Sequence, residues 1–157
     1  MDAQTRDDNP HVIAPPPLIF FAALGLGLIA SLAFPVDFLS PLSRFALGIL
    51  LIALAAGGLL SAFRTMQRAG TPVDPGETPR AIVSSGPYRF SRNPIYLSMA
   101  FFVLGVGLLA DALWVIVLLP LALLVVNYGV IAREERYLER KFGPAYLQYK
   151  SAVRRWI

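Results

Sequence analysis

Residues 94–132 read PIYLSMAFFVLGVGLLADALWVIVLLPLALLVVNYGVIA, an apolar run of 39 residues in which Asp111 is the only charged side chain. A single helix of this length would be nearly twice as long as the ~30 Å hydrocarbon core of a bilayer, because each helical residue rises about 1.5 Å. It would also hold a carboxylate near its midpoint, where charge is costly. The run therefore predicts two membrane spans joined by a turn, with Asp111 in water.

Two more apolar runs precede this one, at residues 18–34 and 45–63, and neither contains Asp, Glu, Lys or Arg. Hydrophobic residues make up 56% of the chain and charged residues 15%, against about 25% charged in soluble domains. A signal peptide is the alternative for the first run, but the residues before it carry three aspartates and one arginine, unlike a positive leader. The sequence predicts an all-α integral membrane protein with about four transmembrane helices.

The basic residues predict the orientation of these helices. Of the 14 Lys and Arg residues, twelve lie in 64–93 and 133–157. Cytoplasmic loops are rich in Lys and Arg, so we expect both segments to be cytoplasmic. The chain then divides into a cytoplasmic tail over 1–17, two transmembrane helices within 18–63, a cytoplasmic loop over 64–93, a transmembrane hairpin over 94–132 and cytoplasmic helices over 133–157. Both termini are cytoplasmic in this arrangement.

Several classes of function are disfavoured by composition. The chain has no cysteine and a single histidine, His11, so no metal site is predicted. Its basic charge lacks an accompanying aromatic groove, which argues against a nucleic-acid partner and favours attraction to anionic membrane lipids. No charge falls in the middle of a predicted span, whereas coupled transporters usually need one. Any chemistry is therefore expected in the two cytoplasmic segments.

The first cytoplasmic segment contains a turn at Gly86-Pro87 and a predicted helix start at Asn93-Pro94, with asparagine as N-cap and proline at the first helical position. One interpretation is purely structural: the tyrosines belong to an interfacial belt and the arginines follow the positive-inside rule. The other is that free N–H groups and the helix dipole hold the carboxylate or hydroxyls of a polar ligand. That ligand would also meet Tyr88, Arg89 and Arg92.

The second cytoplasmic segment begins with charged residues spaced four apart, Glu135 with Glu139 and Arg136 with Arg140. This spacing is typical of a solvated helix with exposed ion pairs. Gly143-Pro144 then ends the helix, and a second helix is predicted after it. The aromatic and apolar residues of that helix form a stripe that lies either on the membrane surface or over a pocket: Tyr146, Tyr149, Val153 and Trp156.

One ordered set of motifs runs through residues 78–155, half of the chain: Gly86-Pro87-Tyr88, Arg92-Asn93-Pro94-Ile95-Tyr96, Glu134-Glu135, Leu138, Phe142-Gly143, and Tyr146 with Tyr149. This combination resembles the isoprenylcysteine carboxyl methyltransferases and their bacterial relatives, whose pattern overlaps that of the phospholipid N-methyltransferases. The resemblance implies a membrane-embedded methyltransferase of a bacterial inner membrane that transfers a methyl group from S-adenosylmethionine to a lipophilic or lipid acceptor.

Carried over position by position, the resemblance also implies a cytoplasmic cofactor pocket. Arg92 is added because it lies beside the predicted helix start at Asn93-Pro94, where a polar ligand could bind. The expected cofactor-binding residues are Arg80, Ala81, Ile82, Val83, Tyr88, Arg92, Asn93, Pro94, Ile95, Tyr96 and Glu134. Methyl transfer from a sulfonium mainly needs alignment and exclusion of water. If the acceptor is an amine, it must first lose a proton, and Glu135 is the carboxylate predicted to help.

Two positions depart from the eukaryotic prenylcysteine enzymes. Asn93 replaces a histidine, so we interpret this position as a helix cap and cofactor contact rather than an acid or base. Val130 replaces an arginine that contacts the substrate, and Arg133, nearly one turn later, is the candidate to substitute for it. The acceptor is therefore expected to differ. A phospholipid N-methyltransferase, a nicotinamide-dependent membrane reductase and a non-enzymatic membrane scaffold remain the alternatives.

Overall fold

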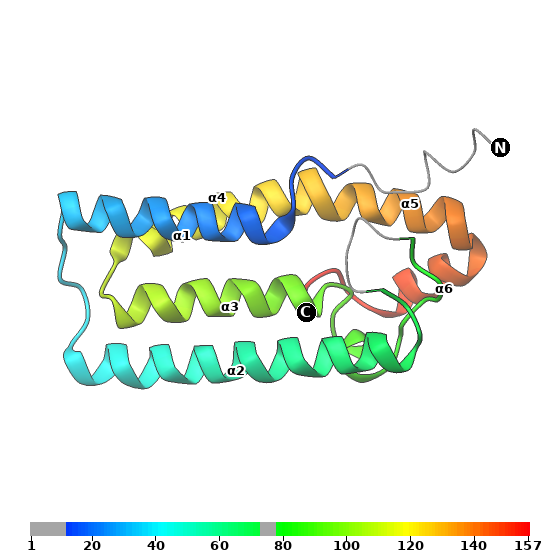
Figure 1. The fold of residues 1–157 in the computed structure, drawn as a ribbon, viewed down its shortest axis with the longest axis horizontal. Coiled ribbons are helices and arrows are strands. Elements are labelled where there is room, and N and C mark those ends of the chain that lie inside the picture. The colour runs from blue at the N-terminus through cyan, green and yellow to red at the C-terminus, as the bar shows by residue number, and fades with distance from the viewer. Residues whose placement is uncertain (1–11, 73–77) are drawn as a thin grey trace.

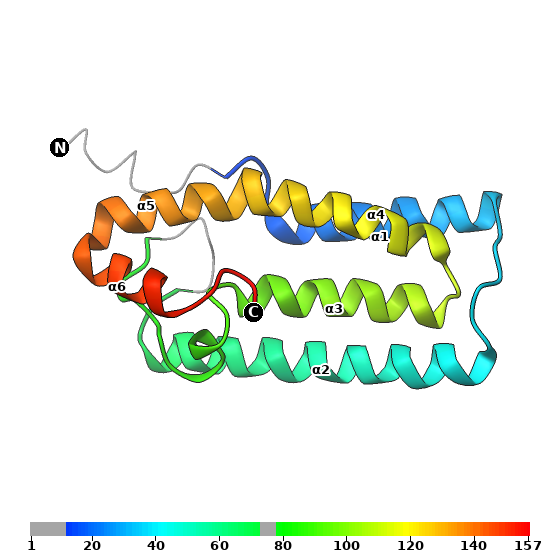
Figure 2. The ribbon, with the colours of Figure 1, turned by 180° about the vertical axis from the view of Figure 1, so that it is seen from behind.

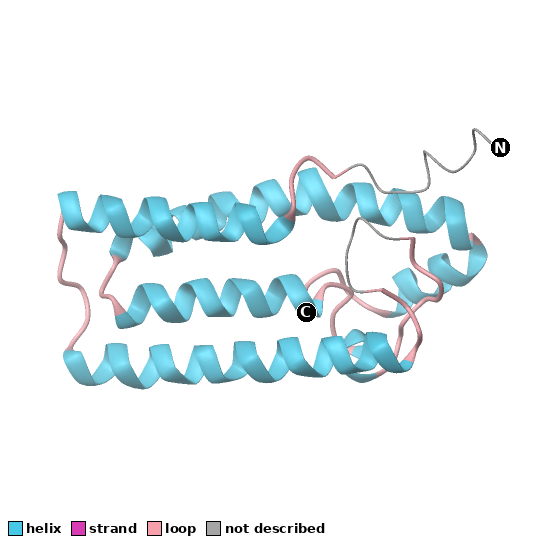
Figure 3. Cartoon of the chain, in the orientation of Figure 1, coloured by secondary structure: helices cyan, strands magenta, loops and turns pink. Residues whose placement is uncertain are grey.

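The computed structural model describes residues 12–72 and 78–157, and every regular element in these residues is helical. The elements are α1 (Pro16–Ala33), α2 (Pro41–Arg68), the 3-10 turn η2 (Gly86–Arg89), α3 (Pro94–Leu109), α4 (Leu113–Val125), the π-helix η3 (Val126–Ile131), α5 (Ala132–Phe142) and α6 (Pro144–Ala152). Figure 3 shows these helices joined by loops, with no strand in the described residues. The prediction of an all-α protein is confirmed.

The four apolar helices lie along one common axis, with α3 between α2 on one side and α1 and α4 on the other (Figure 1). The reverse view shows α4, η3 and α5 as one continuous rod that extends beyond the end of α3 (Figure 2). The short elements η2 and α6 gather at the same end as α5. That end of the bundle therefore carries most of the non-membrane structure.

Three helices are long and apolar enough to cross a bilayer: Pro16–Ala33, Pro41–Arg68 and the continuous run Leu113–Phe142. The fourth, Pro94–Leu109, is shorter, with 16 residues. Large apolar side chains such as Leu32 and Leu42 are more than four-fifths exposed, as expected for surfaces that face lipid. Residues 113–131 of the last run contain no charge and span about 29 Å, so α5 lies beyond the hydrocarbon. The chain is an integral membrane protein.

The predicted hairpin at Asp111 is present, because α3 ends at Leu109 and α4 begins at Leu113. Asp111 has a φ of 51°, a left-handed conformation that makes the turn tight. Its carboxylate is not in water, however: the side chain is 9% exposed and lies 3.6 Å from the Arg44 guanidinium. The prediction was wrong on this point because Arg44, at the start of α2, lies at the same end of the bundle and neutralises the carboxylate.

Small residues let α2 and α3 approach closely. The buried residues of α2 are Gly48, Ala55 and Ala62, spaced seven apart on one face. A Cβ added at Gly48 would lie 2.9 Å from the carbonyl oxygen of Gly105 on α3. Lipid offers no hydrophobic driving force between helices, so such close backbone packing is a main source of their association. This contact holds α2 beside the last turns of α3, at the end of the bundle opposite the candidate site.

We predict that Gly48→Ala destabilises the bundle by about 1–3 kcal/mol, because the new methyl group overpacks the contact between α2 and α3. Gly57→Ala on the same helix is the matched control, since nothing lies within 4 Å of its added Cβ. The control should be neutral or stabilising by up to about 1 kcal/mol, given the better helix propensity of alanine. Denaturant unfolding in detergent measures both, and equal effects would contradict the packing role of Gly48.

Candidate active site

A cavity of about 710 Å³ lies at the end of the bundle opposite the Asp111 turn. Its walls come from the segment before α1, the last turns of α2, the loop through η2, the first turns of α3, and α5 with α6. Elements from nearly the whole length of the chain therefore enclose one space. This volume is within the usual range for a small-molecule site.

The cavity has walls of two kinds. Most of its polar side chains come from η2, the residues between η2 and α3, α3 itself, α5 and α6: Tyr88, Arg92, Asn93, Tyr96, Glu134, Glu135, Tyr137, Tyr146 and Tyr149. The other walls are mainly apolar and include Val12, Pro15, Pro16, Pro17, Phe63, Met66, Ile95 and Met99. A ligand with a polar part and an apolar part, or two ligands of opposite character, fits this division.

Most of the predicted site residues lie around this cavity. The cofactor candidates that line it are Ala81, Ile82, Val83, Tyr88, Arg92, Asn93, Pro94, Ile95, Tyr96 and Glu134, and the catalytic candidate Glu135 joins them. Arg80 and Arg133 are not among the lining residues. Arg80 is exposed, and its backbone N–H donates to Thr71 Oγ1 at 2.9 Å. The roles of these residues stay predictions.

The helix start at Asn93-Pro94 is observed, but Asn93 does not cap it with its side chain. The Asn93 amide instead donates from Nδ2 to the carbonyl oxygen of Arg155 at 2.9 Å. The Arg92 N–H also donates to a carbonyl of the C-terminal segment, that of Arg154, at 3.0 Å. Asn93 is therefore the N-cap residue, as predicted, but its side chain makes no capping hydrogen bond, because a distant piece of backbone takes up its amide.

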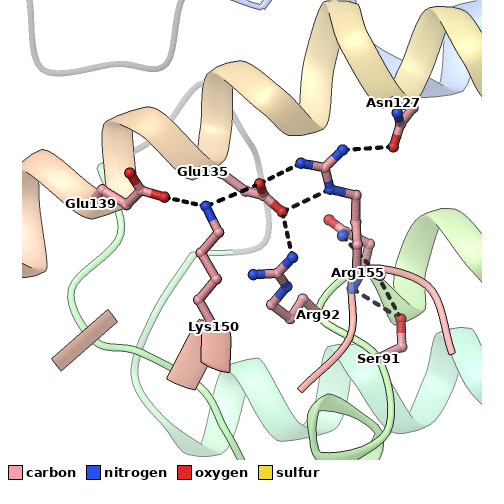
Figure 4. Close-up of polar contacts among 8 residues, drawn as sticks. Ser91, Arg92, Asn127, Glu135, Glu139, Lys150 and Arg155 are labelled. Atoms are coloured by element: carbon pink, nitrogen blue, oxygen red, sulfur yellow. Dashed lines mark hydrogen bonds and ion pairs between the residues drawn. The ribbon is translucent and has the colours of Figure 1, made fainter. Parts of the chain in front are cut away.

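Glu135 lies at the centre of a cluster of cations rather than on a solvated helix face (Figure 4). Its side chain is only 6% exposed. Arg155 donates to both of its oxygens, from Nε at 3.0 Å and from Nη2 at 2.6 Å, and Arg92 Nη2 lies 3.0 Å from Oε1. Lys150 lies 3.8 Å from Oε2 and also pairs with Glu139. The interpretation of this face as exposed pairs was wrong for Glu135.

Arg92 has unused hydrogen-bonding capacity inside this cluster. Its side chain is 9% exposed, and Nη2 pairs with Glu135. Its Nε and Nη1 atoms are buried with no partner within residues 12–72 and 78–157, although Arg92 lines the cavity. Buried donors are nearly always paired in folded proteins. The two unpaired donors make Arg92 a candidate contact for an anionic or strongly accepting ligand group.

Glu134 is a second acidic residue in the lining of the cavity. Tyr96 donates from its hydroxyl to Glu134 Oε1 at 2.7 Å. Burial raises the pKa of Glu134 to about 7, the Tyr96 hydrogen bond opposes this rise, and the nearby Glu135 carboxylate adds to it. The carboxyl group is thus poised near neutral pH, where a cation in the cavity would favour its ionised form.

Tyrosines close the polar side of the cavity. Tyr88 and Tyr146 are buried, and Tyr149 donates from its hydroxyl to the Tyr88 carbonyl oxygen at 2.8 Å. Burial is the largest cause of the raised pKa of each of these three tyrosines, so they are neutral donors. Of the two predicted positions for the aromatic stripe, Tyr146 and Tyr149 of α6 take the one over a pocket, because both line the cavity. Val153 and Trp156 lie beyond the end of α6 at Ala152.

Val130 does not face this cavity. It is fully buried in the core, within the π-helix that precedes α5, and it is not a lining residue. The extra residue in a π-turn changes which side chains face inward. An arginine at this position would lie in the apolar core and not in the cavity. The position of Val130 therefore does not correspond to that of a substrate-binding arginine.

Sequence reasoning missed three parts of the site: the proline-rich residues before α1, the side chains of Phe63 and Met66 at the end of α2, and Arg155. Apolar residues next to a membrane span carry no local signal that distinguishes a cavity wall from a lipid-facing surface. Arg155 lay within a cluster of basic residues that the positive-inside rule already explained. His11, most of the predicted tail and residues 73–77 of the loop lie outside the described residues.

The fold and the cavity define an integral membrane protein with a candidate site next to its membrane spans. The chain belongs to the phospholipid methyltransferase family, whose family model matches residues 43–145, about two thirds of its length. This is the family whose motif overlaps that of the isoprenylcysteine carboxyl methyltransferases. Membership of the latter stays a prediction.

Two curated relatives share shorter regions. The chain is similar to an uncharacterized protein of Haemophilus influenzae, with 60% identity over 35 residues, which covers 22% of this chain and 56% of that protein. It is also similar to the cobalt-zinc-cadmium resistance protein CzcN of Cupriavidus metallidurans, with 34% identity over 74 residues, which covers 47% of this chain and 34% of that protein. The chain thus spans about half or less of these relatives. No solved structure matches it.

We predict that Tyr96→Phe raises the pKa of Glu134 above its value of about 7, because it removes a hydrogen bond to the ionised form. The carboxyl band in the infrared spectrum, followed from pH 5 to pH 9, measures this titration. Glu134→Gln identifies the band by abolishing it. An unchanged midpoint in Tyr96→Phe would show that the hydroxyl contact does not stabilise the carboxylate.

Proposed function

We propose that this chain is an S-adenosylmethionine-dependent methyltransferase that acts on a lipophilic acceptor taken from the membrane. One observation carries the proposal: the free donors of Arg92 and the carboxyl group of Glu134 line the same cavity as an apolar wall of prolines, Phe63 and Met66. Membership of a family of membrane methyltransferases supports it.

The residues of the cavity fit S-adenosylmethionine. Its carboxylate matches the two buried donors of Arg92, since guanidinium–carboxylate pairs are among the strongest hydrogen bonds in proteins. Its positive charge matches Glu134, and its adenine ring matches the tyrosine-lined wall. When bound, the cofactor supplies an electrophilic methyl group on a sulfonium.

The chain's own contribution is then to bind, align and exclude water. Arg92 would hold the donor at one end, while Tyr88 and Tyr146, both buried, keep water from the polar wall. Both Glu135 oxygens are engaged by arginines, so this residue is better placed to orient Arg92 than to take a proton from an acceptor. Arg133 is outside the cavity lining, and a role for it in acceptor binding has no geometric support.

The acceptor would lie against the apolar wall. Pro15, Pro16 and Pro17 begin or precede α1, and Phe63 and Met66 lie near the end of α2, so this wall is continuous with two of the membrane-spanning helices. A lipid could therefore reach the cavity without leaving the bilayer. In the orientation that the basic residues favour, the site would face the cytoplasm of a bacterial inner membrane, with both termini on that side.

We predict that Glu134→Gln weakens binding of S-adenosylmethionine by roughly 10- to 150-fold, the loss expected for a hydrogen bond to a charged group. Glu139→Gln is the matched control, because Glu139 lies on the same helix, outside the cavity lining, and pairs with Lys150. Isothermal titration of the purified protein in detergent measures both affinities. Equal, small effects would argue against Glu134 as a cofactor contact, and binding of a nicotinamide dinucleotide instead would favour a reductase.

For the acceptor, we predict that isotopically labelled methyl groups pass from S-adenosylmethionine into a membrane-lipid extract, and slowly or not at all into a minimal farnesylated cysteine. A prenylcysteine carboxylate needs a buried cation, and Arg92 is the only Lys or Arg in the described cavity lining. Mass spectrometry of the extract identifies the product. Efficient methylation of the farnesylated cysteine that Arg133→Ala abolishes would overturn this view.

A further inference from the structure

Residues 153–157 cross the start of α3 and tie it to α5. Asn93 and Arg92 donate hydrogen bonds to the backbone carbonyls of Arg155 and Arg154, and Ser91 Oγ lies 3.4 Å from the Arg155 carbonyl oxygen. The Arg155 side chain turns the other way and reaches α5 and η3 (Figure 4). One residue therefore contacts the polar wall of the cavity from two sides.

The side-chain contacts form a chain that ends at the cavity. Asn127 of the π-helix accepts from Arg155 Nη1 at 3.0 Å, and the other two nitrogens of Arg155 bind both oxygens of Glu135. Glu135 in turn pairs with Arg92 Nη2. This bidentate geometry holds the Glu135 carboxylate in one orientation, which a single contact would not do.

We infer that Arg155 is a positioning residue: through Glu135 it orients Arg92, so that the free Nε and Nη1 donors of Arg92 bind the carboxylate of the methyl donor. Arg155 itself is not a lining residue of the cavity. This inference rests on the proposed function. It adds a distant residue that sets the affinity for one chemical group of the cofactor.

The physical reason lies in the length of the Arg92 side chain. An arginine has several rotatable bonds, and fixing them on binding costs free energy. Within the part of the chain that the structure describes, Arg92 has one side-chain ion pair, at Nη2, and its other two nitrogens are unpaired. If Glu135 rotates, this pair no longer directs Arg92, and the donor carboxylate must then order the arginine as it binds. The two hydrogen bonds from Arg155 hold the Glu135 carboxylate in place before the ligand binds, so Arg92 is already ordered.

The test compares two ligands that differ by one group, S-adenosylmethionine and its decarboxylated form, on the full-length protein in detergent. Arg155→Lys should raise the Kd for S-adenosylmethionine roughly tenfold, because a lysine cannot form the bidentate contact with both Glu135 oxygens. The Kd for the decarboxylated ligand should change by less than about threefold. Arg155→Ala should have a larger effect of the same selectivity, so the conservative variant gives partial rescue.

Arg154→Ala is the matched control, because it removes the same charge from an exposed neighbour and keeps the backbone carbonyl that binds Arg92. It should leave both affinities within about twofold. Asn127→Ala is a second, milder variant, which loosens Arg155 without touching the cavity lining. Its effect should also be selective for the carboxylate-bearing ligand, which keeps the test decisive if an Arg155 variant does not fold.

Equal losses for the two ligands in Arg155→Lys and Asn127→Ala would overturn the inference, since Arg155 would then act on the fold or on another anion such as a lipid phosphate. Unchanged affinities would overturn it as well. If the unaltered protein binds neither ligand, the proposed function itself fails, and this inference fails with it. A protein that binds both ligands without the predicted selectivity retains the proposed function and loses only the role of Arg155.

Discussion

The buried carboxylate of Glu135 is the interaction on which the polar end of this protein depends. A buried charge is costly unless it is paired and hydrogen-bonded. Here the partners are Arg92 before α3, Lys150 on α6 and Arg155 beyond α6. Satisfying one carboxylate therefore requires three separate segments to meet at α5, and that meeting forms the polar wall of the cavity.

The membrane-spanning helices hold the segments of this polar end in place. The α2–α3 contact through Gly48 and Gly105 fixes α2 beside α3, and the rod of α4, η3 and α5 carries Glu134 and Glu135 directly out of the bilayer. The cavity lies where these supports leave the apolar region. A site with one polar and one apolar wall is the natural result of this position.

The motifs shared with the methyltransferases are short, and most of their residues meet at the cavity. Ten of the eleven residues predicted to bind a cofactor line it, although they come from the η2 loop, α3 and α5. The resemblance pointed to all of them except Arg92, because residues of one site can belong to one motif even when they come from different elements of the fold. It did not show that Val130 faces the core or that Arg133 lies outside the cavity lining, since position in a motif does not define the direction in which a side chain points.

The sequence alone determined the helices, the break at Asp111 and the two polar segments, because hydrophobic runs, prolines and charges act over a few neighbouring residues. Only the tertiary structure decided which charges meet. Arg44 reaches Asp111 and Arg155 reaches Glu135 across 67 and 20 residues of sequence, and the walls from α1 and α2 join the cavity in the same way. Such contacts depend on the packing of whole helices, and no local pattern carries that information.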